Sequence, residues 1–159
     1  MKLRKMTKAD NPAIKKLVQD SLKTLGYDIP GTAYFDPQLD DLFNYYRTHS
    51  PGQYWVIEQE HQIIGGVGIA PFSEASGICE LQKLYLAEKF QGLGLSKKLM
   101  VAALNFAKKH YRQCYLETHT DLATACRLYE KYGFQLLNGP LKGSEHSAMN
   151  AWYLLDLEN

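Results

Sequence analysis

The sequence has few cysteines and no long apolar run, and each shortage excludes a class of protein. Its 159 residues contain three cysteines, at positions 79, 114 and 126. An odd number without close pairing predicts reduced thiols, with neither a disulfide framework nor a metal site. No stretch reaches the roughly 20 apolar residues of a membrane span, and the N-terminus lacks a signal peptide's apolar core. We therefore expect one cytoplasmic domain covering residues 1–159.

The sequence also has little net charge. Its 18 basic and 17 acidic residues leave a formal net charge of +1. Proteins that bind nucleic acid or an anionic membrane through electrostatics usually carry a strong positive field, so neither partner is expected. A surface of this balance favours a small-molecule or peptide ligand over a strongly charged polymer.

The stretch at residues 78–109 organises the rest of the chain. Residues 78–86 are apolar and free of glycine and proline, which predicts a buried strand. Gly92 and Gly94 then form a turn, and apolar residues recur at helical spacing from Leu95 onward. The first amides of a helix are unpaired and weakly positive, and glycine lets a phosphate approach them. The pattern predicts an anion-binding helix start, although a glycine-containing turn before a helix is often only a turn.

Two common phosphate motifs do not fit this turn. No P-loop is present, and Lys97 stands where the dinucleotide fingerprint requires its third glycine. The segment Gln91-Gly92-Leu93-Gly94-Leu95-Ser96 instead resembles the acyl-CoA pyrophosphate loop of the GNAT superfamily of N-acyltransferases, with Ser96 in place of the usual glycine or alanine.

A second segment carries the same resemblance. Residues 125–134, Ala-Cys-Arg-Leu-Tyr-Glu-Lys-Tyr-Gly-Phe, match the superfamily pattern except at the preceding asparagine, which is Leu122 here. In the superfamily that asparagine often contacts the pantetheine arm. Two motifs in the expected order make the resemblance specific, and it covers most of the chain, least clearly at residues 27–50.

The resemblance implies a fold, a reaction and a cofactor site. The fold is α/β (α+β): a mixed, mostly antiparallel sheet of about seven strands with helices on both faces. The reaction is direct transfer of an acetyl group from acetyl-CoA to a primary amine of a small molecule or peptide, without a metal. The residues implied to bind the cofactor are Leu84, Tyr85, Leu86, Gln91, Gly92, Leu93, Gly94, Leu95, Ser96, Lys97, Ala125 and Tyr129.

Glu80 and Tyr129 are the candidate catalytic residues. An alkylammonium must lose a proton before it attacks, and a carboxylate can accept that proton, often through water. Glu80 precedes Gln91 by the separation at which some superfamily members carry a catalytic glutamate, and Tyr129 matches the position that protonates the departing thiolate. Glu117 is the rival base, with His119 and His146 as weaker rivals. Glu80 could also be a solvent-facing or lysine-paired side chain, and Tyr129 a packing residue.

The remaining elements follow from periodicity and turn signals. We expect strands at residues 2–6, 53–58, 63–70, 113–118, 134–137 and 151–157, and helices at 10–26 and 37–48. Asp121 is expected to cap the helix that contains Tyr129, and residues 71–77 to form a loop. Gly65, Gly66 and Gly68 fit either a bulge or close packing. Candidate contacts to the acceptor are the aromatic residues Tyr27, Tyr34, Phe35, Tyr45 and Tyr46.

Ser96 and Leu122 also motivate a second hypothesis, a catalytically silent CoA-binding sensor or interaction domain. The presence of Glu80 and Tyr129 argues against it. Homodimers are common in the superfamily, although no stretch of this chain marks an interface.

Overall fold

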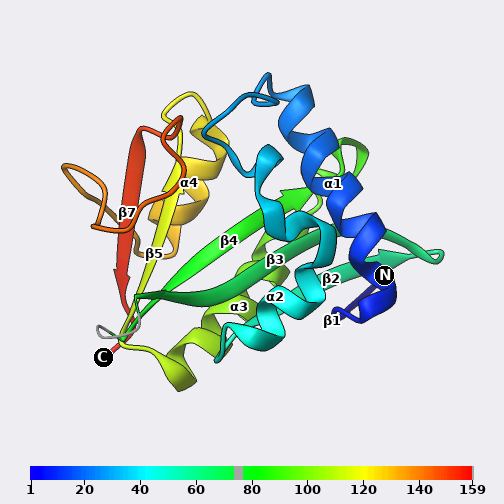
Figure 1. Ribbon diagram of the computed structural model, residues 1–159, viewed down its shortest axis with the longest axis horizontal. Helices are drawn as coiled ribbons and strands as arrows, with labels where there is room; N and C mark the ends of the chain where they lie inside the picture. Colours follow the sequence, from blue (N-terminus) through cyan, green and yellow to red (C-terminus); the bar gives the residue numbers. More distant parts are fainter. Residues whose placement is uncertain (74–76, 159) are drawn as a thin grey trace.

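A computed structural model of the protein, describing residues 1–73 and 77–158, contains a seven-stranded sheet in the order β1-β2-β3-β4-β5-β7-β6 (Figure 1). The strands are β1 (Lys2–Lys5), β2 (Gln53–Gln59), β3 (Gln62–Ser73), β4 (Ile78–Leu86), β5 (Gln113–Thr118), β6 (Gln135–Leu136) and β7 (Ala151–Asp156). The α-helices are α1 (Asn11–Thr24), α2 (Leu42–Thr48), α3 (Leu95–His110) and α4 (Ala123–Lys131). This is the mixed, mostly antiparallel α/β fold that we expected. Within the described residues, no helix is long and apolar enough to cross a membrane.

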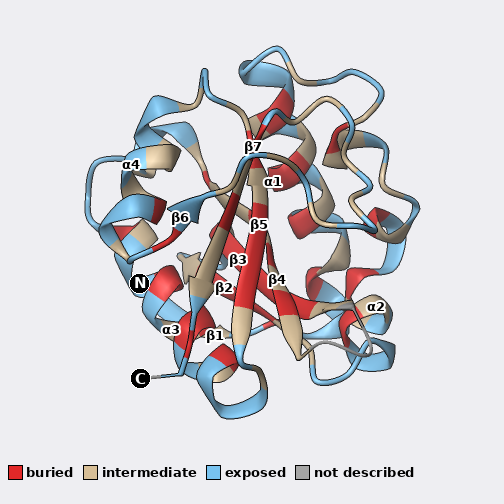
Figure 2. Ribbon diagram, turned by 90° about the vertical axis from the view of Figure 1, so that its left-hand side faces the viewer, coloured by how far each residue is buried: buried red, intermediate tan, exposed pale blue. Residues whose placement is uncertain are grey.

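Two hydrophobic cores lie on opposite faces of the sheet. Successive side chains of a strand point to opposite faces, so Trp55 and Ile57 of β2 pack in the core beneath α3, whereas Tyr54 and Val56 pack beneath α1 and α2. The central strands are accordingly the most continuously buried part of the chain (Figure 2). The helices thus pack on both faces of the sheet.

The sheet splits between its two central parallel strands. β4 and β5 are paired only where residues 78–80 lie beside residues 113–115. Beyond Glu80, β4 continues to Leu86 with β3 as its neighbour, and β5 continues to Thr118 with β7. A gap therefore opens at the carboxyl ends of the two parallel strands, which is the usual place for a ligand in sheets of this kind.

A bulge in β4 lies beside this gap. Opposite the single residue Val67 of β3, β4 has two residues, Lys83 and Leu84. Lys83 has a φ of 50°, which is uncommon for a residue with a side chain. Its carbonyl oxygen accepts a hydrogen bond of 2.8 Å from the Tyr54 hydroxyl. A buried tyrosine on β2 therefore stabilises the bulge from below.

The glycines of β3 make room for this support. A Cβ on Gly66 would lie 2.4 Å from the Tyr54 ring, and one on Gly68 would lie 2.3 Å from the Tyr46 hydroxyl oxygen. Both glycines are therefore required by close packing of these tyrosines. This explains why these glycines occur in a strand, although glycine has a weak strand propensity.

Several expected boundaries were wrong. The helix expected at residues 37–48 is a 3-10 turn at Pro37–Asp41 followed by α2, because the Asp41 side chain accepts a hydrogen bond from the Asn44 amide and starts a new helix there. The strand expected at 134–137 shortens to β6. β3 extends through Ser73 into the expected loop at 71–77, of which residues 74–76 lie outside the described residues.

Asp121 does not cap α4, contrary to expectation. The N-cap position is Leu122, which has no capping side chain. The Asp121 amide instead donates a 3.1 Å hydrogen bond to Nδ1 of His119, so this pair shapes the turn before α4 rather than its first amides.

Candidate active site

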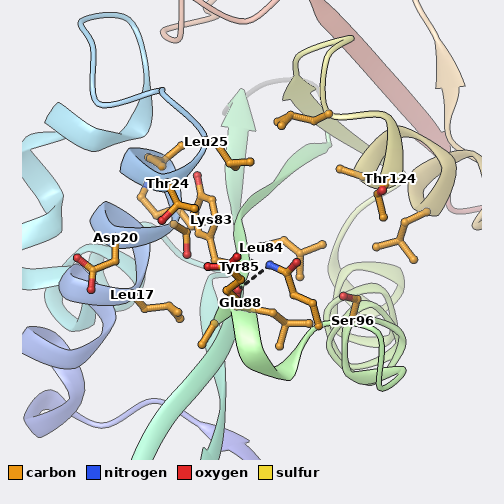
Figure 3. Close-up of a pocket in the computed structure, with 18 of the residues that line it drawn as sticks. Leu17, Asp20, Thr24, Leu25, Lys83, Leu84, Tyr85, Glu88, Ser96 and Thr124 are labelled. Carbon is orange, nitrogen blue, oxygen red and sulfur yellow. Dashed lines mark hydrogen bonds between the residues drawn. The ribbon is translucent and has the colours of Figure 1, made fainter.

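A cleft of about 1350 Å³ lies over the gap between β4 and β5. Figure 3 shows Leu17, Asp20 and Thr24 of α1 along one wall, and Ser96 of α3 and Thr124 of α4 along the other. The floor is the bulged end of β4. Of the expected cofactor-binding residues, those that line the cleft are Leu84, Tyr85, Leu86, Gln91, Gly92, Gly94, Ser96, Lys97, Ala125 and Tyr129.

The turn before α3 is open toward an anion. Gly92 and Gly94 have φ values of 79° and 76°, which glycine adopts without strain. A Cβ at either position would meet nothing within 4 Å, so the space above both residues is free for a ligand. Gly94 is the N-cap residue of α3, and the Gln91 side chain donates a 3.2 Å hydrogen bond to the Leu86 carbonyl, which fixes the turn to β4.

Two expected cofactor residues contribute no side chain to this cleft. Leu93 is 60% exposed and Leu95 is buried in the hydrophobic core, and neither is among the described residues that line the cleft.

The end of β4 directs a backbone amide into the gap. The Ala87 amide donates a 2.8 Å hydrogen bond to the Ile64 carbonyl of β3. Successive amides along a regular strand point to opposite edges, so the amide of Leu86 points away from β3 and toward the cleft. Leu84 belongs to the bulge, where this alternation is interrupted. The Leu86 amide is a donor that a carbonyl or amide of a bound ligand can use.

A second, smaller cavity of about 70 Å³ adjoins the cleft. Glu80, Gln82 and His146 line it but do not line the cleft. The two cavities share as lining residues Leu22, Leu81, Lys83, Tyr85, Glu117 and Met149. The candidate base therefore lies on the far side of the gap from the glycine turn.

Glu80 accepts a hydrogen bond of 2.7 Å from Nε2 of Gln82. Removal from water raises the pKa of Glu80 to about 7; the Gln82 bond opposes this rise and the nearby Glu117 carboxylate adds to it. Glu80 is thus only partly exposed, and among the described residues it forms no ion pair with a lysine, although its sequence context allowed a solvent-facing or lysine-paired side chain. A carboxylate with a pKa near neutrality can take up and release a proton at physiological pH.

Gln82 is itself held by two aromatic residues of α2. The Tyr46 hydroxyl donates a 2.8 Å hydrogen bond to Oε1 of the Gln82 side chain. Nε2 of the same side chain donates a 3.4 Å hydrogen bond to the Tyr45 hydroxyl. The chain of support therefore runs from Gly68, whose missing Cβ admits Tyr46, through Gln82 to Glu80. Tyr45 and Tyr46 act here as supports for a carboxylate.

We expect Gly68→Ala to lower the free energy of unfolding by about 1–3 kcal/mol, because the added methyl overpacks a buried site against Tyr46. Urea unfolding measures the change. Gly139→Ala is the matched control, since a Cβ there meets nothing within 4 Å, and should change stability by less than about 0.5 kcal/mol. Equal effects at the two positions would contradict the packing argument.

A charged network surrounds the small cavity. Asp36, in the loop between α1 and α2, contacts Nζ of Lys83 at 2.9 Å and Nε2 of His146 at 3.0 Å. On the other side of its ring, Nδ1 of His146 lies 3.6 Å from Oε1 of Glu117. Glu117 also accepts hydrogen bonds from the hydroxyls of Tyr115, at 2.8 Å, and Ser144.

These contacts shift the pKa values of His146, Asp36 and Glu117. Burial opposes protonation of His146, but Asp36 and Glu117 outweigh it and raise the pKa of the ring to about 10. Burial would raise the pKa of Asp36, yet His146 and Lys83 hold it below its ordinary value. The pKa of Glu117 is lowered in the same way, because His146, Ser144 and Tyr115 outweigh burial. The network therefore favours the ionised forms of Asp36 and Glu117 and the protonated form of His146 at neutral pH.

Glu80, Glu117 and His146 also bring one potential metal ligand each within 4.8 Å of one another. In the structure His146 contacts the carboxylates of Asp36 and Glu117 at 3.0 and 3.6 Å. The cluster therefore fits an ion-pair network.

Tyr129 lines the cleft from α4, and its ring packs against those of Phe134 and Tyr153 at centroid distances of 6.0 and 6.2 Å. Burial raises the pKa of its hydroxyl above the ordinary value. Among the described residues that hydroxyl has no hydrogen-bond partner. Tyr129 is therefore both a packing residue and a free donor at the cleft.

The other expected site residues are placed differently. His119 packs against Tyr27 at 5.5 Å and lines neither cavity within the described part of the chain. Tyr34 and Phe35 pack edge to face, and Phe35 is 59% exposed. Of the three rivals to Glu80, the structure brings Glu117 and His146 to the small cavity and leaves His119 outside.

Sequence reasoning missed Asp36, Gln82, Lys83, Tyr115 and Ser144. Gln82 and Lys83 follow Glu80 on the same strand, so a polar run in an otherwise apolar strand was a usable signal. Asp36 and Ser144 come from separate loops whose approach to β4 and β5 no local pattern indicates.

Comparison with known proteins places the chain in a family. Residues 19–134 match the model of the acetyltransferase (GNAT) family. An uncharacterized N-acetyltransferase of Escherichia coli, YjgM, is 39% identical over 148 residues, covering 91% of this chain and 87% of the relative. The chain belongs to the GNAT acetyltransferase family. It is an acyltransferase of that family, as its sequence resemblance implied.

Structural likeness agrees with this assignment. The putative acetyltransferase yncA of Salmonella typhimurium, solved with acetyl-CoA, has a TM-score of 0.77 at 19% identity, covering 100% of this chain and 95% of that one. The PaiA N-acetyltransferase of Thermoplasma acidophilum, solved with coenzyme A, has a TM-score of 0.73 at 18% identity, covering 98% of each chain. At these identities the likeness shows the shared fold.

Proposed function

We propose that this protein transfers an acetyl group from acetyl-CoA to the amine of a small molecule or peptide, with Glu80 as general base and Tyr129 as proton donor. The observation that carries the proposal is the meeting of two cavities at the split between β4 and β5, with the open glycine turn on one side and Glu80 on the other. The two substrates can then approach the same point from opposite sides.

The residues of the cleft fit coenzyme A. Gly92 and Gly94 leave open space at the start of α3, where unpaired amides and the helix dipole favour a pyrophosphate. Bound there, coenzyme A supplies the thioester whose acetyl group is transferred. The Leu86 amide faces the cleft, and Leu84 lines it; their backbone amides are the candidate donors to negative charge on the acetyl oxygen as the amine attacks.

Glu80 and Tyr129 can then act in sequence. Glu80 accepts a proton from the acceptor ammonium, directly or through water, which frees the nitrogen lone pair. Tyr129 donates a hydrogen bond, and then a proton, to the departing sulfur. Its raised pKa keeps the phenol protonated and therefore available throughout the neutral range.

Calorimetric titration with acetyl-CoA, with free coenzyme A as the comparison, tests the cofactor site. We expect micromolar binding at one site per chain, and thiol release when an amine panel is then supplied. Binding without turnover of any amine would favour the silent, CoA-binding alternative. No binding would show that Ser96 and Leu122, which depart from the family motifs, have removed the site.

We expect Gly94→Asp to weaken acetyl-CoA binding by more than about tenfold, because one like charge beside the pyrophosphate costs at least about 1.4 kcal/mol in a partly desolvated site. Gly94→Asn is the matched control, since both side chains tolerate the positive φ of this position and have similar size. Equal losses in the two variants would mean that bulk, and not charge, is responsible.

A further inference from the structure

The small cavity has charged walls of both signs. Glu80 and Glu117 line it together with Lys83 and His146, and the rest of its lining is mostly apolar. Its volume is about 70 Å³, and it adjoins the larger cleft through shared lining residues. Two loops close over it, because the Ala148 amide donates a 3.0 Å hydrogen bond to the Gly31 carbonyl and His146 contacts Asp36. A group that occupies this cavity must be small and must match its charges.

Glu117 has a buried oxygen that accepts no hydrogen bond from the described residues. Its side chain is 2% exposed, and Oε1 makes no hydrogen bond within the described residues, while Oε2 accepts from Tyr115 and Ser144. Nδ1 of His146 forms an ion pair with Oε1 at 3.6 Å, a distance too long for a hydrogen bond. Leaving a buried acceptor unpaired costs about 1–3 kcal/mol, and more for a charged group. Such an atom facing a cavity indicates a ligand that donates to it, and an ammonium has the matching charge.

Lys83 supplies the opposite charge. Its side chain is 2% exposed, and its ammonium has three donors, of which one is used by Asp36 among the described residues. Asp36 contacts both Lys83 and His146 and lines neither cavity among the described residues. The bulge at Lys83 explains how a lysine of a central strand reaches this position. The remaining donors of Lys83 indicate an anionic group on the ligand.

We propose that the acceptor is a small amine that also carries a carboxylate, of the amino-acid class, with its ammonium at Glu117 and Glu80 and its carboxylate at Lys83. This inference rests on the acetyl transfer proposed above. In the reaction Glu80 removes one proton from the ammonium, the nitrogen forms a bond to the acetyl carbon, and the carbon–sulfur bond breaks. The thiolate takes a proton from Tyr129, and the nitrogen loses a second proton as the amide forms, which restores the Tyr129 phenol. The products are the N-acetyl amino acid, the free thiol and the proton held by Glu80.

Matched pairs of acceptors test the inference. We would measure kcat/KM by thiol release for alanine against alaninamide and for β-alanine against β-alaninamide, each pair differing in the carboxylate charge. One charge-assisted hydrogen bond predicts about a tenfold to hundredfold preference for the acid of at least one pair. Lys83→Gln should reduce the acid-to-amide ratio to near one, because the amide can still donate to Asp36 while the charge is lost.

Three further variants serve as controls for this test. Lys108→Gln, an exposed change of the same charge on α3, should leave the acid-to-amide ratio unchanged. If Lys83→Gln does not fold, the double variant Lys83→Gln/Asp36→Asn removes both members of the buried ion pair and should lose the same preference. Glu117→Gln should raise KM for acids and amides alike, because it weakens the ammonium contact common to both.

The outcomes separate this inference from the proposed function. Equal rates for acid and amide, or a preference that survives in Lys83→Gln, would overturn the amino-acid acceptor and leave acetyl transfer intact. Failure of every amine, acid or neutral, to be acetylated while acetyl-CoA binds would overturn acetyl transfer and the acceptor inference together.

Discussion

Glu80→Gln should lower kcat by about 10²- to 10⁴-fold, the usual contribution of a general base. The substitution is close in size, and its carbonyl oxygen can still accept the hydrogen bond from Gln82, so the small cavity should keep its shape. Acetyl-CoA binding should be unchanged, because Glu80 does not line the cofactor cleft. Thiol release under saturating substrates, with calorimetry on the same preparation, measures both quantities.

The pH profile identifies the base more directly than the loss of rate. With a pKa of about 7, Glu80 is protonated and inactive at lower pH, so kcat/KM of the native protein should rise tenfold per pH unit below about 7 and level off above it. Glu80→Gln should lose this rising limb. Glu158→Gln, an exposed change of the same type, should retain it. An unchanged inflection in Glu80→Gln would instead identify another group, with Glu117 the first candidate.

The contribution of Glu80 to the free energy of unfolding should fall as the pH rises, whereas kcat/KM should increase. Because the folded-state pKa of Glu80 lies above its ordinary value of 4.5, the folded protein disfavours the charged form. The contribution of the protonated carboxyl is therefore fully present at low pH and is lost as the pH rises through about 7. The melting temperature of Glu80→Gln relative to the native protein should thus increase between pH 5 and pH 8. A constant difference would mean that the pKa of Glu80 is not raised.

The sequence was sufficient for the sheet, the glycine turn and the position of Glu80, because these depend on local pattern. A strand followed by glycines and an amphipathic helix is specified within about 30 residues. The environment of Glu80 could not be predicted from the sequence. Gln82 is held by Tyr46, 36 residues away, and Asp36 meets His146 across 110 residues. Such contacts depend on how loops fold over the sheet, and no periodicity encodes them.

The role of the glycines in β3 also depends on contacts with distant residues, which the sequence pattern does not identify. Their spacing in the sequence allowed a bulge or close packing, and the structure contains both, on different strands. The bulge is on β4 at Lys83, whereas Gly66 and Gly68 give space to Tyr54 and Tyr46. A glycine indicates that something approaches closely, but the approaching residue lies elsewhere in the chain. Here Tyr54 binds the bulge carbonyl and Tyr46 binds Gln82, so both glycines serve the site.

Tyr129→Phe should lower kcat by about 10²-fold, the loss typical of one donor removed from a developing negative charge. The hydroxyl has no hydrogen-bond partner among the described residues, so its removal should cost little stability, while the ring keeps its packing against Phe134 and Tyr153. KM for acetyl-CoA should change less than about threefold, since the donor acts on the sulfur only as it leaves.

Tyr132→Phe is the matched control for this prediction. Tyr132 follows Tyr129 by one helical turn, and its hydroxyl contacts the Lys97 carbonyl at 3.5 Å rather than the cleft. The control should keep native kcat. A rise in KM for acetyl-CoA at unchanged kcat in Tyr129→Phe would show uniform binding of the cofactor. In that case Tyr129 would position the cofactor, and the proton for the departing thiolate would have to come from solvent.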